Sequence, residues 1–252
     1  MDKRSSRGGL SRPDKGEPRA PVSLEVYPPR EDTHLVLGFA HVPAGTTLVE
    51  VGAGNGLSSL AAARGGAHVV ATDLNRTALE RLQRTAREEG IDLAVVRTDL
   101  LAGLRRFERV LANPPYLPTG SDEVDPDPGT RLALDGGPDG CRVLGRLVRT
   151  LADHLAPAGS AFVLVSSLQD EWVREAILAR WRTEGGLAEV VAARTLEGER
   201  LEVLRLWRPM EASGAEGPTR GPGHRRRPRR GSAGRRRTPT PSRPASSRAP
   251  AR

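Results

Sequence analysis

The chain has 252 residues, with 39 Lys and Arg against 31 Asp and Glu, and its hydrophobic content of 37% is low for a protein that folds along its whole length. Its single cysteine, Cys141, excludes an internal disulfide and a thiolate zinc cluster, and no apolar run approaches the roughly 20 residues that span a bilayer. The basic N-terminus has no apolar segment after it and does not resemble a secretory signal, so we expect a cytoplasmic protein.

The charge is distributed unevenly along the chain. Residues 1–20 hold 6 Lys and Arg against 3 Asp and Glu, and residues 211–252 hold 12 against 2. The stretch 21–210 therefore has 21 basic and 26 acidic residues and a net charge of −5, although the whole chain is at +8. We expect the basic residues 1–20 and the Arg-, Pro- and Ser-rich residues 211–252 to be disordered, and residues 21–210 to form one domain.

The basic C-terminal tail permits two interpretations. Arginine-rich segments bind RNA and other polyanions by counterion release, with an affinity that depends on salt and not on sequence. The same composition also suits a solubilising extension without a ligand, and the sequence leaves both open.

In chain order, the central stretch alternates between helical and apolar segments. The segment "EDTHLVLG" at 31–38 is typical of a helix start, with acids and a Thr in its first turn. Short, Val-rich segments, typical of strands buried on both faces, follow at 46–52, 67–73, 93–99, 107–113 and 160–167. Helical segments lie between them at 57–65, 75–90 and 140–157, and Asn75 and Gly90 are suited to begin and end the second.

This order of strands and helices predicts the fold. Alternating β and α segments form a doubly wound, mostly parallel α/β sheet of the Rossmann-like class. Near the end of the domain, residues 188–196 and 199–208 are strand-like and separated by a short turn. They are predicted to pair as an antiparallel hairpin at one edge of the sheet.

A glycine-rich turn follows the first predicted strand, in "EVGAGNGLSS". Gly52, Gly54 and Gly56 allow the backbone to turn sharply and to approach a ligand at the start of the next helix. The dinucleotide fingerprint requires a further Gly where this chain has Leu57, which disfavours NAD and favours a mononucleoside-sized ligand. Glu50 just before the glycines suits a ligand ammonium group and not a pyrophosphate.

Two acidic residues end the next strands. Asp73 lies 21 residues after Gly52, where a carboxylate can accept hydrogen bonds from both ribose hydroxyls of a nucleoside. Asp99 ends the third predicted strand, close to the expected position of an adenine edge. Because the carboxyl ends of parallel strands meet at one edge of the sheet, these side chains should share a site.

The fourth predicted strand ends in "LANPPYLPTG". Pro114 has no N–H for a strand ladder, and it holds Asn113 in an extended conformation. In isolation Asn-Pro-Pro is an ordinary turn. Its place after the fourth strand, beside the predicted nucleoside site, favours a functional role.

With these motifs in this order, the chain resembles the class I S-adenosylmethionine-dependent methyltransferases of the NPPY group, and among them the HemK-type glutamine methyltransferases of peptide-chain release factors. Residues 26–37, "VYPPREDTHLVL", are similar to the V-Y-x-P-x-E-D-[ST] opening of the small eukaryotic and archaeal branch. Residues 132–147 resemble that branch's G-G-x-x-G-x-x-V segment, and residues 199–208 its closing strand. The resemblance covers about residues 26–208, without the N-terminal helical domain of the larger bacterial branch.

The resemblance implies a reaction and its residues. The Asn113 side-chain oxygen and the Pro114 carbonyl would accept both N–H bonds of a glutamine amide, Pro115 would keep the turn rigid and Tyr116 would stack on the amide plane. It also implies contacts to S-adenosylmethionine from residues of successive strand ends: Thr33, Glu50, Gly52, Gly54, Asp73, Asp99, Leu100 and Asn113. No residue is expected to bind a metal ion.

Two segments near the predicted site have open interpretations. The acidic, Pro-rich stretch 121–130 is either a solvated loop or a loop that closes over the substrate. The glycines of 135–140 either shape the substrate slot or form a plain turn before the next helix.

The expected partners follow from the resemblance. The substrate is a class I release factor, methylated at the glutamine of its GGQ motif. Members of the resembling branch work with a small zinc-binding activator protein that adds to the sheet edge at the third strand, and residues 91–100 have the apolar character for such a pairing.

Two other functions are considered beside this one. NPPY motifs also serve enzymes that methylate the exocyclic amine of adenine, and a basic tail suits a nucleic acid, but the folded part is net acidic and has no additional module for base flipping. A non-catalytic, RNA-associated adaptor is disfavoured by the complete NPPY sequence.

Overall fold

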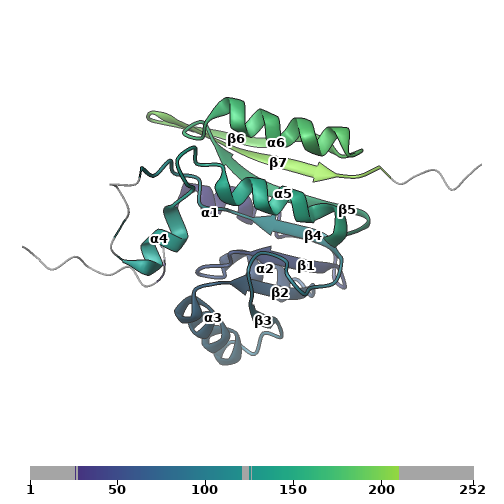
Figure 1. Ribbon diagram of the computed structural model, residues 1–252. Helices are drawn as coiled ribbons and strands as arrows, with labels where there is room; N and C mark the ends of the chain where they lie inside the picture. The colour runs from purple at the N-terminus through teal and green to yellow at the C-terminus, as the bar shows by residue number, and fades with distance from the viewer. Residues whose placement is uncertain (1–25, 27, 121–124, 126, 210–252) are drawn as a thin grey trace, which may run out of the picture. The chain divides into compact units, whose positions relative to one another are not determined.

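The computed structural model describes residues 26, 28–120, 125 and 127–209. Within these residues, seven strands form one sheet with helices on both faces (Figure 1). The tails predicted for residues 1–20 and 211–252 lie outside the described residues. Among the helices that the structure describes, none combines the length and apolar character needed to cross a bilayer.

The sheet has the predicted doubly wound order. Its strands are β1 (Thr47–Val51), β2 (His68–Asp73), β3 (Ala94–Arg97), β4 (Phe107–Ala112), β5 (Leu155–Ser166), β6 (Leu187–Leu196) and β7 (Glu199–Trp207). They lie in the order β3-β2-β1-β4-β5-β7-β6, parallel from β3 to β5 and antiparallel from β5 to β6. The predicted hairpin is confirmed, with β6 at one edge of the sheet and β3 at the other.

Six helices complete the described fold. They are α1 (Glu31–Leu37), α2 (Leu57–Arg64), α3 (Arg76–Glu88), α4 (Pro128–Leu134), α5 (Arg142–His154) and α6 (Glu171–Thr183). In one core cluster, leucines of α5 pack with Leu178 and Trp181 of α6 against one face of the sheet. A second cluster packs Val36 of α1 and Ala62 of α2 against the other face.

Several elements differ from the predictions; among the strands, β5 begins at Leu155 and not at 160, and β3 ends at Arg97 and not at 99. The helix expected to reach residue 157 ends at His154, because Leu155 already pairs with Phe107 and the proline at 157 is incompatible with a continued helix. Helix α6 was not predicted, since Leu178 and Trp181 are its only fully buried residues and its apolar stripe is weak. Helix α4 begins inside the stretch interpreted as a loop; Asp127 caps it by accepting a hydrogen bond from the Thr130 N–H at 2.7 Å.

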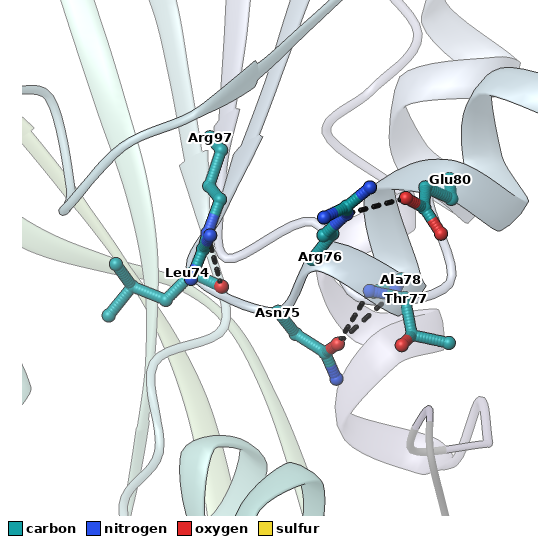
Figure 2. Close-up of polar contacts among 7 residues, drawn as sticks. All are labelled: Leu74, Asn75, Arg76, Thr77, Ala78, Glu80 and Arg97. Atoms are coloured by element: carbon teal, nitrogen blue, oxygen red, sulfur yellow. Dashed lines mark hydrogen bonds and ion pairs between the residues drawn. The ribbon is translucent and has the colours of Figure 1, made fainter.

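The predicted cap of the second helix is confirmed and lies next to the site. The Asn75 side chain accepts hydrogen bonds from the backbone N–H groups of Thr77 at 3.0 Å and Ala78 at 3.3 Å, and α3 begins one residue later (Figure 2). Gly90, with φ at +65°, follows the end of α3. Arg97 of β3 donates to the Leu74 carbonyl at 3.1 Å, so the edge strand is bound to the turn that carries the cap.

The register of the parallel strands determines where their ends meet. Val51 lies opposite Thr72 on one side and opposite Ala112 on the other. The residues that follow these three positions therefore leave the sheet at the same level.

Candidate active site

A cavity of about 350 Å³ opens at the carboxyl ends of the parallel strands. Its lining comes from the ends of β1, β2 and β4, from the residues after β3, and from α1, α4 and α5. The lining includes every residue that the sequence suggested for cofactor or substrate: Thr33, Glu50, Gly52, Gly54, Asp73, Asp99, Leu100, Asn113, Pro114, Pro115 and Tyr116. In the part of the chain that is described, no group of three or more His, Cys, Asp or Glu side chains is arranged to hold a metal ion.

The glycine turn after β1 needs its glycines for conformation and for space. Gly52, Gly54 and Gly56 all have positive φ, at 68°, 53° and 72°. A Cβ at Gly56 would lie 2.3 Å from a methyl carbon of Leu82, so α2 and α3 approach each other through this glycine.

Asp73 holds the turns on both of its sides. One carboxylate oxygen accepts from the Gly54 N–H at 2.9 Å and the other from the Asn75 N–H at 2.8 Å. Each oxygen of a carboxylate has two lone pairs, so both oxygens keep a lone pair that can accept from a ligand. The carboxylate is thus fixed in position at the cavity wall.

Glu50 is a buried acid at the base of the cavity. Its carboxylate accepts hydrogen bonds from the backbone N–H, at 2.8 Å, and the hydroxyl of Ser59. The pKa of Glu50 is raised to about 7, mainly by burial and to a smaller extent by the nearby Asp73, although hydrogen bonds from Ser59 and Ser58 oppose the rise. A cation bound beside Glu50 would restore the charged carboxylate.

The end of β3 carries an ion pair. The Asp99 carboxylate pairs with the guanidinium of Arg146 from α5, and both side chains remain partly exposed. The next residue, Leu100, has φ at +53°, and its carbonyl accepts from the Thr72 hydroxyl at 3.2 Å. Arg146 was not among the predicted site residues. The sequence could have indicated it, because Arg146 lies four residues after Arg142 on α5 and so shares a helix face with it.

The Asn113 side chain has one amide end bound and the other end free. Its Nδ2 donates to Oδ2 of Asp32 at 3.0 Å. Its Oδ1 is buried, and no group of the described residues lies within hydrogen-bonding distance of it. The sequence did not suggest Asp32 as a site residue, because it belongs to α1 and lies 81 positions from Asn113.

The position of Thr33 is compatible with both roles that the sequence left open. It occupies the first turn of α1, where its hydroxyl faces the Arg30 backbone N–H at 3.5 Å and Oδ1 of Asp32 at 3.3 Å. It also lines the cavity. Helix capping and contact with a ligand are therefore compatible at this position.

The segment after NPPY is clamped by residues 134–140. Leu117 donates to the Leu134 carbonyl at 3.2 Å and accepts from the Gly136 N–H at 2.9 Å, and Thr119 donates to the Gly137 carbonyl at 2.9 Å. A Cβ at Gly140 would lie 2.4 Å from the Tyr116 carbonyl oxygen. Gly140 thus serves close packing against the NPPY segment, whereas a Cβ at Gly136 would lie 2.7 Å from the Gly140 backbone.

Gln169 holds the segment 134–140 in place through hydrogen bonds. It is 3% exposed; its Oε1 accepts from the Ser166 N–H at 3.0 Å, and its Nε2 donates to the Gly140 carbonyl at 2.8 Å. The end of β5 is thereby tied to the segment that touches Tyr116. Sequence inspection missed Gln169, because a Gln after a strand resembles an exposed loop residue.

The chain is similar to several known proteins. The methyltransferase small domain family matches residues 32–125. A putative protein N5-glutamine methyltransferase of Methanocaldococcus jannaschii is 33% identical over 186 residues, which are 73% of this chain and 92% of that protein. A release factor glutamine methyltransferase of Deinococcus radiodurans is 36% identical over 64% of this chain, which spans only 60% of that protein.

Among solved structures, the E. cuniculi Mtq2–Trm112 complex, described as responsible for methylating the eRF1 translation termination factor, has a similar fold. The TM-score is 0.56 at 24% identity, over 73% of this chain and 99% of the matched one. At this identity the similarity concerns the fold.

Proposed function

This chain belongs to the protein N5-glutamine methyltransferase family, and we propose that it methylates the side-chain amide nitrogen of the GGQ glutamine in a class I peptide-chain release factor. The methyl donor is S-adenosylmethionine. The choice of a release factor as substrate is supported by the relatives that carry this activity in their names, of which the chain spans about 60%.

The residues of the cavity fit S-adenosylmethionine. The volume of about 350 Å³ suits a mononucleoside-sized ligand, the Asp73 carboxylate is fixed with free lone pairs for ribose hydroxyls, and the buried Glu50 lacks a cation beside it among the described residues. When bound, S-adenosylmethionine supplies an electrophilic methyl group on a sulfonium. We assign the ammonium to Glu50, the adenine to Asp99 and Leu100, and backbone contacts to Gly52, Gly54 and Thr33.

One observation carries the assignment of the acceptor. Asn113 lines the cavity directly before Pro114, and its buried side-chain oxygen has no hydrogen-bond partner among the described residues. A primary amide has two N–H bonds and a nitrogen lone pair that is delocalised into its carbonyl. Asn113 Oδ1 and the Pro114 carbonyl accept these N–H bonds and direct the nitrogen, while Pro115 keeps the turn rigid and Tyr116 stacks on the amide plane.

The reaction needs little acid–base chemistry from the protein. No histidine is among the residues that line the cavity. The amide nitrogen becomes cationic as it is methylated, and its proton is then acidic enough to leave to water. The protein therefore contributes by orienting the amide nitrogen toward the methyl group.

A partner is proposed at the β3 edge. In the E. cuniculi complex, a protein of similar fold is bound to a second protein, Trm112, and β3 has one side without a pairing strand among the described residues. A small zinc-binding protein that adds a strand there would cover β3 and stiffen the loop that carries Asp99 and Leu100. We also propose a cytoplasmic location. Residues 211–252, which lie outside the described residues, are proposed to contact RNA with an affinity that depends on salt.

The test uses the purified full-length chain, with and without a candidate activator, and tritiated S-adenosylmethionine. We expect methylation of an isolated class I release factor, and none when its GGQ glutamine is replaced by alanine. Adenine-containing DNA and RNA are assayed in parallel. Methylation of the nucleic acid alone would replace the proposed substrate by the exocyclic amine of adenine.

The residue assignment has its own test. Asn113→Ala should keep most of the cofactor affinity and lower the methylation rate by about 10² or more through lost orientation. Asn113→Asp should also lower the rate, because its charge stabilises the cationic ground state more than the transition state. A normal rate in both variants would mean that NPPY is only a structural turn.

A further inference from the structure

The contact between Asp32 and Asn113 decides which end of the Asn113 amide faces the substrate. We propose that Asp32 is a positioning residue, which holds the Asn113 oxygen toward the cavity and so makes the site select acceptors that donate N–H over acceptors of the same shape that do not. The inference rests on the proposed glutamine methylation and adds a residue and a basis for specificity.

Asp32 is held firmly in place. Its side chain is 5% exposed, although it is a carboxylate. One oxygen accepts from the Thr33 backbone N–H at 2.7 Å and, more weakly, from the Thr33 hydroxyl at 3.3 Å. The helix that carries it is anchored by the buried Val36, one helical turn further on, so Asp32 has little freedom to move away from Asn113.

The second oxygen of Asp32 defines the orientation of Asn113. An asparagine amide has nearly the same shape in its two flipped orientations, so its neighbours must distinguish the NH₂ from the oxygen. A carboxylate only accepts hydrogen bonds, and Asp32 Oδ2 lies 3.0 Å from Asn113 Nδ2. The NH₂ must therefore face Asp32, which leaves Oδ1 as the buried acceptor without a partner.

The orientation of Asn113 determines whether the substrate side chain must donate or accept a hydrogen bond. A glutamine amide donates N–H to Oδ1, whereas a glutamate carboxylate of the same length would place an oxygen against it. In the opposite orientation of Asn113, its NH₂ would face the cavity and favour the glutamate.

The substitution Asp32→Asn should produce this opposite orientation. The Thr33 N–H still requires an acceptor, so the amide oxygen of the new side chain takes that position and its NH₂ faces Asn113. Two NH₂ groups cannot face each other, and Asn113 must flip so that its oxygen accepts from residue 32. The variant changes one atom and keeps the shape of the site.

The experiment measures three quantities for the full-length chain and its variants: cofactor affinity, the methylation rate at saturating release factor, and binding of two synthetic peptides that differ only by Gln or Glu at the target position. Wild type should bind the Gln peptide at least tenfold more tightly. Asp32→Asn should keep cofactor affinity within about threefold, lose about 10² in rate, and lose or reverse the preference for Gln. Glu31→Gln, on the exposed side of the same helix, removes the same charge and should match wild type on all three.

The paired substitution separates positioning from a general structural role. In Asp32→Asn combined with Asn113→Asp, the NH₂ of residue 32 again faces an acceptor, and the other oxygen of residue 113 faces the substrate. The double variant should exceed each single variant in rate by about tenfold. The proposal would be overturned if the losses of rate in the two single variants simply added in the double variant. It would also be overturned if Asp32→Asn kept the wild-type rate and the wild-type peptide preference. If Asp32→Asn does not fold, Asp32→Ser, which leaves Asn113 free to adopt both orientations, should show the same loss of peptide preference, and an unchanged preference would overturn the proposal.

Failure of the proposed function gives a different result. Wild type would then bind neither peptide and would methylate adenine in the parallel assay. The adenine amine also donates N–H, so the same variants are compared on that substrate, and an unchanged rate in Asp32→Asn would reject the positioning role there.

Discussion

The cavity and the residues that support it fall into a proposed cofactor half, which comprises residues 50–56, 73–75 and 98–100, and a proposed acceptor half, which comprises Asp32, residues 113–119 and 134–140, and Gln169. In the cofactor half, the supports of Asp73 and Glu50 join positions close in sequence: Asp73 to Asn75, Glu50 to Ser59, and Gly54 to Asp73, separated by 2, 9 and 19 positions. The segment at 99–100 differs, because Asp99 pairs with Arg146 and Leu100 with Thr72, 47 and 28 positions away. In the acceptor half, Asn113 relies on Asp32, 81 positions away, and Gly140 on Gln169, 29 positions away.

The chemistry of the two halves differs as well. Carboxylates dominate the cofactor half, as expected for a site that holds hydroxyls and a cation. The proposed acceptor half offers neutral oxygens to an N–H₂ group, from the Asn113 amide and the Pro114 carbonyl, while the Asp32 carboxylate in this half is bound to Asn113 Nδ2. Affinity for the cofactor and orientation of the acceptor should therefore be separable by mutation.

The largest separation is expected at Asp73. Asp73→Ala removes the proposed acceptor for two ribose hydroxyls and the support of Gly54. At roughly 1.5 kcal/mol or more per hydrogen bond to a charged group, S-adenosylmethionine affinity should fall by about 10² or more. Calorimetry measures this affinity. Asp92→Ala, at an exposed carboxylate before β3, is the matched control, and equal affinities in the two variants would contradict the assignment.

Gly140→Ala should damage the acceptor half alone. Its Cβ would lie 2.4 Å from the Tyr116 carbonyl oxygen, so the NPPY segment must shift, and the methylation rate should fall by about 10² while cofactor affinity stays within about threefold. Gly90→Ala has a similar positive φ of 65° but open space around its Cβ. Both variants should lose about 1–2 kcal/mol of stability to backbone strain, but only Gly140→Ala should lose activity.

The pH dependence of cofactor binding should test whether Glu50 binds the cationic group of the cofactor. With its pKa at about 7, Glu50 is protonated below that pH and must release a proton to bind a cation, so affinity should fall by up to tenfold per unit as the pH drops below about 7. Calorimetry in buffers of different ionisation enthalpy should detect proton release at pH 6 and none at pH 8. Glu50→Gln should bind more weakly and without the pH dependence; proton release that persists in this variant would point to another group.

The same residue links binding to stability. The pKa of Glu50 is raised from its ordinary value of 4.5, so the native state holds more protons than the unfolded state between about pH 4.5 and 7. The protein without cofactor should therefore lose stability as the pH rises through this window. Above pH 7, Glu50→Gln should be more stable than wild type by on the order of 1–3 kcal/mol in the free energy of unfolding. Thermal denaturation should show this as a higher unfolding temperature.

The smallest effect on catalysis is expected from removal of residues 211–252. Both halves of the cavity lie before residue 208, so methylation of an isolated release-factor domain should remain at the wild-type rate. Binding to RNA, measured across salt concentrations, should weaken and become less dependent on salt. Loss of activity on the small substrate would show that the tail takes part in the reaction.

The sequence by itself determined the parallel sheet, its closing hairpin, the Asn75 cap and the polar residues at strand ends that line part of the cavity. It did so because each of these features follows from a local pattern: Val-rich strands, glycines at a turn, and polar residues at successive strand ends. Parallel topology then requires that those strand ends meet at one edge of the sheet.

Only the tertiary structure decided how the acceptor half is supported. Asp32 appeared in the sequence as an acid in the first turn of a helix, and Gln169 as a loop residue, yet both are buried and bound to segments distant in the chain. An asparagine also carries no sign of which end of its amide will face a ligand. That orientation is set by a carboxylate 81 positions away, through a contact that exists only once α1 has packed beside the end of β4.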